Sequence, residues 1–184
     1  MNNGTNNTAL LVMDVQPGII ERIANKEAYL SKVQAAVDAA HEKNIPVLYV
    51  VVGFRQGLPE INPNNKSFSA IKTSAPGYLV NPQTVMPMLE HDVLIVKRRV
   101  SAFAGSDLEV VLRAKAIQHM VLAGIATSGV VLSTLREAAD KDYQLTVLSD
   151  LCADMDEEVH SVLMGKIFSR QAAVVTAAEW LVSL

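Results

Sequence analysis

The chain contains six short, mostly apolar runs, each followed by a polar residue or a turn. The first of them, TALLVM at residues 8–13, ends at Asp14 and lacks the alternation of a half-exposed strand. Continuous apolar runs of this length are typical of strands covered on both faces, as in a parallel sheet. The pattern therefore predicts strands at residues 8–13, 47–52, 92–96, 121–125, 144–148 and 172–175.

Segments between these runs carry helical spacing. Residues 27–43 place apolar side chains on one face of a helix, which Asn44 closes. Further helices are predicted at residues 81–89, with a break at Pro87, from Ser106 or Asp107 to 116, and at 177–184. Another helix is predicted behind a turn at 126–129, with Ser128 as its N-cap. A further helix is predicted from Asp154, with Glu157 at capping-box spacing. Alternating strands and helices predict an α/β fold, a three-layer α/β/α sandwich with a six-stranded, mainly parallel sheet.

The chain reads as one domain. Residues 8–184 have no repeat, low-complexity block or linker, whereas residues 1–7 are polar and predict a disordered lead-in. Residues 54–77 form a long connection rich in Pro, Asn, Gly and Ser. Connections of this length inside a compact domain are usually functional or mobile.

Composition excludes several classes of function. Half of the 184 residues are hydrophobic (50%), and 16 basic against 19 acidic residues give a net charge of -3. This balance predicts no nucleic-acid or membrane partner, and no apolar run approaches the roughly 20 residues that cross a bilayer. The single cysteine, Cys152, excludes an internal disulfide and fits a reducing, cytoplasmic setting.

Ligands of open parallel sheets bind beyond the carboxyl ends of the strands. Asp14 and Lys97 are the informative residues at those ends. A buried Asp has a raised pKa suited to proton transfer, and a neighbouring Lys would hold it ionised and stabilise an anion. The alternative is that Asp14 caps a turn and Lys97 is a solvated strand end.

The stretch VLAGIATSGVVLSTLREA, residues 121–138, reads as a strand, a turn of small residues and a helix. The turn residues Ala126, Thr127, Ser128 and Gly129 let another group approach the backbone closely. The unpaired amides at the start of the following helix favour developing negative charge. Enzymes with α/β folds often hold a nucleophile at such a turn.

No metal or cofactor is expected from the motifs. His41, His91 and His119 precede predicted strands, at the edge away from Asp14, and no D-x-H or H-x-x-x-H arrangement is present among the histidines. The sequence also lacks a Gly-rich phosphate loop and a G-x-S-x-G elbow.

Three motifs together resemble the isochorismatase-like hydrolase superfamily, which includes nicotinamidases, N-carbamoyl amidohydrolases and isochorismatases. They are Asp14 followed by Gln16, Lys97 followed by SAF at 101–103, and GIATSGVVLSTLREAADKDY from Gly124. The resemblance covers roughly residues 8–181. It implies a six-stranded parallel sheet and, in the cysteine hydrolases, an Asp–Lys–Cys triad whose Asp is the general base. Asp14 and Lys97 match the Asp and the Lys.

The nucleophile does not match. The family's cysteine falls at Val130, which has no nucleophilic atom, so a thioester cannot form there. The family's cis peptide would fall at Ile125–Ala126, and its turn amides bind the oxyanion. Cys152 is interpreted as structural, because a lone thiol without a base or a cation beside it is usually inert.

Two functions stay open. The resemblance to isochorismatases, which lack the thiol, implies acid catalysis by Asp14 on a vinyl ether or an activated C–N bond of a small molecule. The alternative is a catalytically silent protein that binds a small carboxylate or amide. Gln16, Phe54, Phe68 and Phe103 are candidate pocket residues, and Arg55 and Lys97 are candidate partners of a carboxylate. The resemblance also implies a homo-oligomer, a dimer or a tetramer.

Overall fold

The computed structural model describes residues 7–74 and 77–184. Most of the predicted lead-in lies outside these residues. Its last residue, Asn7, is ordered, because its carbonyl accepts from the Gln118 amide at 2.8 Å and its side chain donates to Gln118 Oε1 at 3.1 Å. The described residues thus include the last residue of the predicted lead-in.

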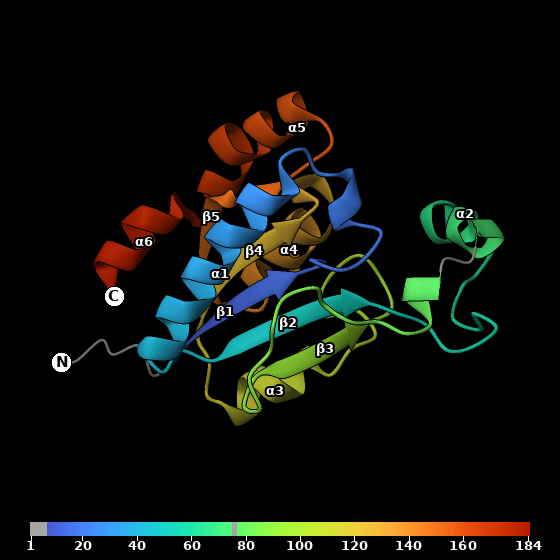
Figure 1. Cartoon of the computed structure of the whole chain (residues 1–184), viewed down its shortest axis with the longest axis horizontal. Coiled ribbons are helices and arrows are strands. Elements are labelled where there is room, and N and C mark those ends of the chain that lie inside the picture. Colours follow the sequence, from blue (N-terminus) through green and yellow to red (C-terminus); the bar gives the residue numbers. More distant parts are fainter. Residues whose placement is uncertain (1–6, 75–76) are drawn as a thin grey trace.

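Within the described residues, the strands form one six-stranded sheet in which every pair is parallel (Figure 1). The order is β3-β2-β1-β4-β5-β6. The strands are β1 (Thr8–Met13), β2 (Val47–Val52), β3 (Val93–Lys97), β4 (His119–Ile125), β5 (Gln144–Ala153) and β6 (Ala173–Val175). Strands β2 and β3 follow β1 toward one edge of the sheet, and β4, β5 and β6 then follow on the other side of β1 toward the opposite edge. The carboxyl ends of β1 and β4 therefore flank the point where the strand order reverses, which is where open α/β sheets bind ligands.

Helices cover both faces of the sheet, as predicted. They are α1 (Lys26–Glu42), α2 (Lys66–Ser74), α3 (Leu108–Ala114), α4 (Leu132–Asp140), α5 (Glu157–Val162) and α6 (Ala177–Ser183). Shorter turns of helix are η2 (Ile20–Arg22), η3 (Gly77–Leu79), η4 (Thr127–Val131), η5 (Leu163–Ile167) and η6 (Phe168–Arg170).

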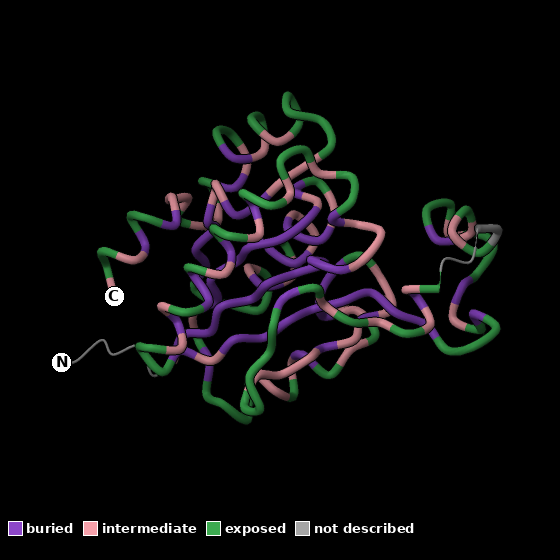
Figure 2. Tube along the Cα trace, viewed as in Figure 1, coloured by how far each residue is buried: buried purple, intermediate pink, exposed green. Residues whose placement is uncertain are grey.

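The strand β1 explains why its sequence is apolar throughout. Leu10 and Val12 pack with α1 and α6 on one face, whereas Leu11 and Met13 pack with α3, α4 and Phe168 on the other. Both faces are covered, so each residue of β1 is buried (Figure 2). A third apolar cluster, which includes Phe54, holds the connection after β2 against the body.

Three sequence predictions need correction. Residues 81–89 form no helix, because two prolines interrupt the segment and Thr84 Oγ1 donates to the Val15 carbonyl at 2.9 Å. The connection at 54–77 contains a helix that the sequence analysis did not predict, α2, which lies to one side of the sheet in Figure 1. The strand β5 runs to Ala153 and not to Leu148, because its pairing with β4 resumes after a register shift, at Gly124–Cys152 and Ile125–Ala153.

The fourth correction concerns α5. The helix begins at Glu157 with Asp156 as its cap, whose carboxylate accepts from the Val159 amide at 3.1 Å. Asp154, predicted as its start, is instead engaged by the turn after β4. Among the described residues, no helix is both long and apolar enough to cross a bilayer.

Candidate functional site

Asp14 and Lys97 meet at the carboxyl edge of the sheet. Asp14 directly follows β1 in a left-handed conformation with φ 56°, and Lys97 ends β3, beyond the intervening strand β2. The long Lys97 side chain reaches back across β2, and its Nζ lies 2.9 Å from Asp14 Oδ2. The two side chains are 2% and 9% exposed respectively, so this ion pair is buried.

The two oxygens of Asp14 differ in their surroundings. Oδ2 is paired with Lys97, whereas Oδ1 is buried and, within the described part of the chain, has no hydrogen-bond partner. Buried polar atoms are normally satisfied, so an unpartnered carboxylate oxygen in a cavity points to a ligand or a proton. Burial raises the pKa of Asp14 above its ordinary value, and Lys97 opposes that rise.

The turn after β4 lies beside Asp14. Gly124 approaches β1 so closely that a Cβ at this position would lie 2.3 Å from the Met13 carbonyl oxygen, and its φ of 152° suits glycine. The peptide Ile125–Ala126 is cis, as the resemblance implied. The close approach of Gly124 to Met13 places the turn against the end of β1.

Three hydrogen bonds fix the turn. The Ser128 amide donates to Asp154 Oδ2 at 2.7 Å, Thr127 Oγ1 lies 2.8 Å from His160 Nδ1, and the Gly129 amide donates to the Ala126 carbonyl at 3.0 Å. Ser128 is not a side-chain cap, contrary to the sequence prediction, because its amide and not its hydroxyl makes the contact. His160 and Asp154 were missed as supports, because they follow the turn by about thirty residues and share no motif with it.

A cavity of about 190 Å³ opens onto Asp14 and the turn. Its wall is mostly apolar, with Lys97 and Asp14 inside. The lining residues are Asp14, Ile19, Arg22, Val52, Phe68, Lys97, Val100, Ile125, Ala126, Gly129, Val130 and Met155. Val130, at the position of the family nucleophile, is thus a wall residue beside Asp14.

Several candidate residues lie outside this wall. Gln16 bridges to β2, donating to the Val52 carbonyl at 3.1 Å and accepting from the Val52 amide at 2.8 Å. Phe54 packs edge-on against Phe68, and Phe103 packs in the core beside Tyr143. Arg55 extends into solvent and pairs with Glu60 at 2.7 Å. Among the candidates beyond the dyad and the turn, Phe68 does line the cavity.

Four residues of the cavity wall belong to no sequence motif and were not predicted. Ile19 and Arg22 come from the segment after β1, Val100 follows β3, and Met155 precedes α5. Arg22 is exposed, so it provides a cation at the mouth of the cavity in place of Arg55.

Cys152 lies in the core and not on the cavity wall. Its thiol is buried, Sγ lies 3.9 Å from the Leu122 carbonyl oxygen, and burial raises its pKa to about 12. A thiol with that pKa is almost entirely protonated near neutral pH, and nucleophilic chemistry needs the thiolate.

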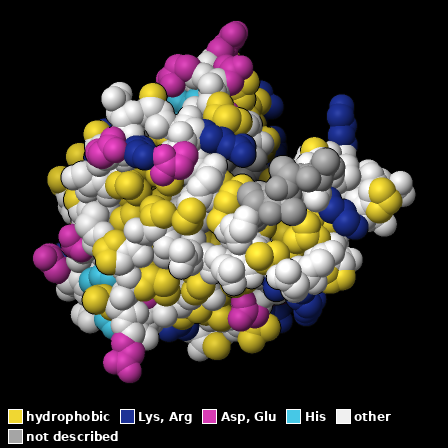
Figure 3. Space-filling view, turned by 45° about the vertical axis from the view of Figure 1, so that its right-hand side comes forward, with side chains coloured by type: hydrophobic (Ala, Val, Ile, Leu, Met, Phe, Trp, Pro, Cys, Tyr) yellow, Lys and Arg dark blue, Asp and Glu magenta, His cyan; other side chains and the backbone are white. Residues whose placement is uncertain are grey.

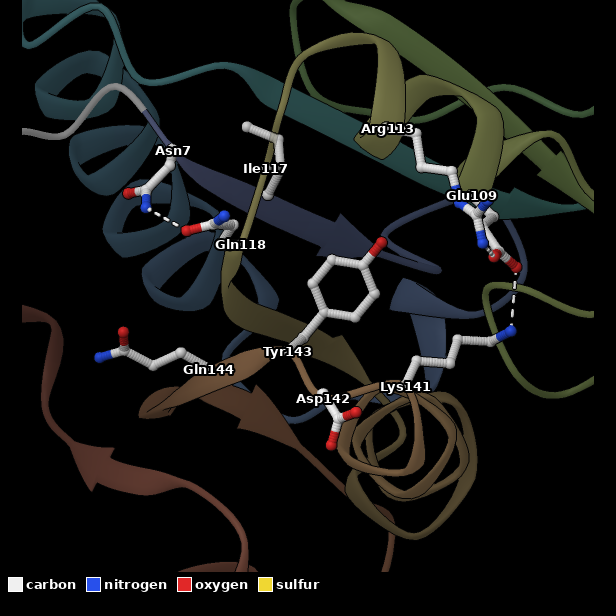
Figure 4. A pocket seen from close by; sticks show the side chains of 9 residues that line it. All are labelled: Asn7, Glu109, Arg113, Ile117, Gln118, Lys141, Asp142, Tyr143 and Gln144. Atoms are coloured by element: carbon white, nitrogen blue, oxygen red, sulfur yellow. Dashed lines mark hydrogen bonds and ion pairs between the residues drawn. The ribbon is translucent and has the colours of Figure 1, made fainter.

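A larger hollow, of about 640 Å³, lies at the opposite edge of the sheet (Figure 4). Three of its charged side chains form ion pairs, since Glu109 contacts both Arg113 and Lys141, and Asp142 also lines the hollow. Figure 4 shows these ion pairs on one wall and Asn7 bonded to Gln118 on another. Among the described residues, this hollow has no buried, unpartnered side-chain atom like Oδ1 of Asp14.

Within the described ranges, one group of side chains is arranged to hold a metal ion: His41, His91 and Asp92. It lies at the amino edge of the sheet, away from Asp14. The cavity itself offers one carboxylate, already paired with a lysine.

Comparisons with known proteins agree with this geometry. A family model described as the isochorismatase domain matches residues 8–179. The chain is 29% identical to a probable inactive nicotinamidase of Arabidopsis thaliana, covering 95% of this chain and 94% of the relative. It is also 29% identical to the ureidoacrylate amidohydrolase RutB of Stutzerimonas stutzeri, covering 91% of this chain and 74% of that protein. The structure of an isochorismatase family protein from Burkholderia thailandensis superposes with a TM-score of 0.81 at 27% identity, covering 97% of each chain.

Proposed function

The chain belongs to the isochorismatase-domain family, and from that premise we propose that it hydrolyses a small molecule by proton transfer from Asp14, without a covalent intermediate. The observation that carries the proposal is the unpartnered, buried Oδ1 of Asp14 in the cavity. A carboxyl group with a raised pKa is suited to donate a proton there.

Lys97 stabilises the carboxylate that Asp14 becomes after it donates its proton. When Oδ1 gives up its proton, the carboxylate that forms is already paired through Oδ2 with the lysine ammonium. The partner that opposes the rise in the Asp14 pKa therefore also stabilises the product of the first step. Water then attacks the protonated substrate, and the proton that this water loses restores Asp14. The resulting adduct breaks its C–O or C–N bond and releases the alcohol or amine.

The valine at the nucleophile position favours substrates that can be hydrolysed without a covalent intermediate. Val130 lines the cavity where a thiol would attack, so an unactivated amide has no acyl-enzyme route here. A vinyl ether or an activated C–N bond becomes electrophilic on protonation and needs only water. Lys97 inside and Arg22 at the mouth favour a substrate that carries a carboxylate.

The turn contributes less oxyanion stabilisation than the sequence suggested. The Ser128 amide is committed to Asp154, and the Gly129 amide to the Ala126 carbonyl. Ala126 and Val130 line the cavity and are the turn positions best placed for an amide to face a bound anion. This arrangement suits acid catalysis better than acyl transfer.

A substrate panel tests the proposal. Small vinyl ethers, imides and amides, each with and without a carboxylate, are incubated with the protein and the products are quantified. We expect turnover of carboxylated vinyl ethers or imides, and no covalent adduct in the mass spectrum of the intact protein. Turnover of amides through a trapped acyl adduct would refute the mechanism.

The second candidate is a silent binder of a small carboxylate. The valine at the nucleophile position favours it, and a relative described as a probable inactive nicotinamidase supports it. The same panel separates the two, because a binder would be thermally stabilised by a carboxylated compound without converting it.

A further inference from the structure

Two histidines and an aspartate meet at the amino edge of the sheet, opposite to Asp14. His41 lies in the last turn of α1, and His91 and Asp92 directly precede β3. One ligand atom from each side chain lies within 4.8 Å of the other two. Figure 3 shows histidine side chains, in cyan, reaching the surface at the lower left of the face that it draws.

Hydrogen bonds within the protein fix the side chain of Asp92. Its side chain is 0% exposed, Oδ2 accepts from the Leu89 amide at 2.8 Å, and Oδ1 lies 2.8 Å from His41 Nε2. A buried carboxylate fixed by a backbone amide is a preorganised ligand whose desolvation has already occurred in folding. This distinguishes the group from a chance gathering of surface acids.

The two imidazoles are placed around it. The rings of His41 and His91 have centroids 5.4 Å apart and are inclined by 73°, so they do not stack face to face. The side chain of His41 is 16% exposed, whereas His91 is an exposed residue and can adjust. Ligand atoms around tetrahedral zinc are about 3.4 Å apart, given bonds of about 2.1 Å, so a small rotation of His91 suffices.

The local field also favours a cation. The carbonyl groups at the end of α1 point toward its last turn, where His41 lies, and carry partial negative charge. Asp92 adds a full negative charge. Two imidazoles and one carboxylate make a ligand set typical of zinc and neighbouring divalent metals, and unlike the all-oxygen sets that magnesium and calcium prefer.

We propose that His41, His91 and Asp92 bind one divalent transition-metal ion, with Zn²⁺ as the ion to test. The ion takes the place of the proton between His41 and Asp92. It ties the end of α1 to the start of β3, two segments about fifty residues apart in the sequence. Because the site lies one strand length, roughly 15–20 Å, from the carboxyl edge, the ion strengthens the fold and does not enter the reaction.

The test is a calorimetric titration of the tag-free, full-length protein with ZnCl₂, together with thermal melts with and without the metal. We expect one Zn²⁺ per chain and a higher Tm in its presence. His91→Ala removes an exposed ligand and should weaken binding by at least roughly tenfold. The matched control is Glu90→Ala, which removes the neighbouring exposed charge and should bind as wild type does.

A second variant separates the loss of a metal ligand from a failure to fold. Asp92→Asn keeps an acceptor for the Leu89 amide but loses the charged ligand, and its metal-free melt reports whether it is folded. Loss of zinc binding in folded His91→Ala and Asp92→Asn supports the site. No binding by wild type, or equal binding by both variants, overturns it.

Discussion

The carboxyl group of Asp14 has one oxygen on Lys97 and one without a partner in the described structure. Burial favours the protonated form and the lysine favours the ionised form. These two opposing influences act on the same proton, whose transfer is the role that we propose for Asp14. Cys152, the single thiol of the chain, lacks such a partner and is protonated.

The pH dependence of hydrolysis follows from the direction of this shift. The pKa of Asp14 is raised above its ordinary value of 3.8, and the acid is active only while protonated. We expect kcat/KM to be highest below that raised pKa and to fall as the pH rises through it. A rate that instead rises with pH over this range would assign Asp14 the role of a base. The profile is measured on the best substrate of the panel, within the range where the fold is intact.

Replacing Cys152 tests whether the thiol has any chemical role. We expect Cys152→Ser to keep its hydrolase activity within a small factor, because the thiol lies outside the cavity wall. Its stability should fall by about 1–3 kcal/mol if the buried hydroxyl finds no acceptor, and by less if it bonds to the Leu122 carbonyl. Initial rates and denaturant melts give both numbers. A collapse of activity in a folded variant would move the reacting centre toward β5.

At the scale of elements, the site is built where β1 and β4 end. Gly124 brings β4 and its turn against Met13, and Thr127 and Ser128 anchor that turn to His160 and Asp154. These anchors are separate contacts, so the turn is held independently at Thr127 and at Ser128. Val130 lies in this turn, at the position where the sequence resemblance places the nucleophile.

Installing a thiol at that position tests the shape directly. We expect Val130→Cys to react with iodoacetamide, because residue 130 lines the cavity beside Asp14 and Lys97. The matched control is Val131→Cys, whose side chain would lie in the core and should stay unreactive. Alkylation is followed by intact mass. Equal reactivity at both positions, or none at Val130→Cys, would show that the turn lacks the hydrolase arrangement.

Much of this element could be predicted from the sequence. The apolar runs indicated the strands, and the order of Asp14, Lys97 and Gly124 along the chain indicated which strand ends carry the site. The cavity wall could not be predicted in the same way. Arg22, Val100 and Met155 come from separate loops whose positions depend on tertiary packing. The pairing of Arg55 with Glu60 likewise depends on how one loop folds back on itself.

The helix predicted at 81–89 illustrates a different limit. The segment was predicted as a helix, but the Val85 amide and Thr84 Oγ1 both donate to the Val15 carbonyl in the loop after β1. Two prolines also oppose helix formation there. The start of α5 was misplaced because Asp154 and Asp156 are equally good caps by residue type. The Ser128 amide engages Asp154, which leaves Asp156 as the cap.

At the scale of the whole molecule, the sandwich is covered on both faces of the sheet, yet apolar side chains are exposed near the site. Met155 is 67% exposed, and Val159 and Val162 on α5 are 37% and 41% exposed. Met155 also lines the cavity, so whatever covers this surface would also border the site. We propose that a second copy of the chain packs here, which would make the protein a dimer or a tetramer.

Light scattering coupled to size exclusion tests this. We expect a mass that is a multiple of the 19.9 kDa chain, and a shift toward the single-chain mass in Val159→Glu, which places a charge in the apolar surface. Val182→Glu serves as control, because Val182 is 89% exposed and lies on α6. A wild-type mass of a single chain would contradict the proposal.

The central claim is that the proton of Asp14 drives the reaction, and Asp14→Asn tests it most directly. Asparagine is nearly isosteric and can still accept from Lys97, but it cannot transfer the proton. We predict that kcat/KM on the best panel substrate falls by about 10²- to 10⁴-fold, while Asp38→Asn, an exposed carboxylate on α1, keeps the wild-type value. Thermal melts of both variants verify that they are folded. An Asp14→Asn protein that is folded and hydrolyses the substrate at the wild-type rate would contradict the account.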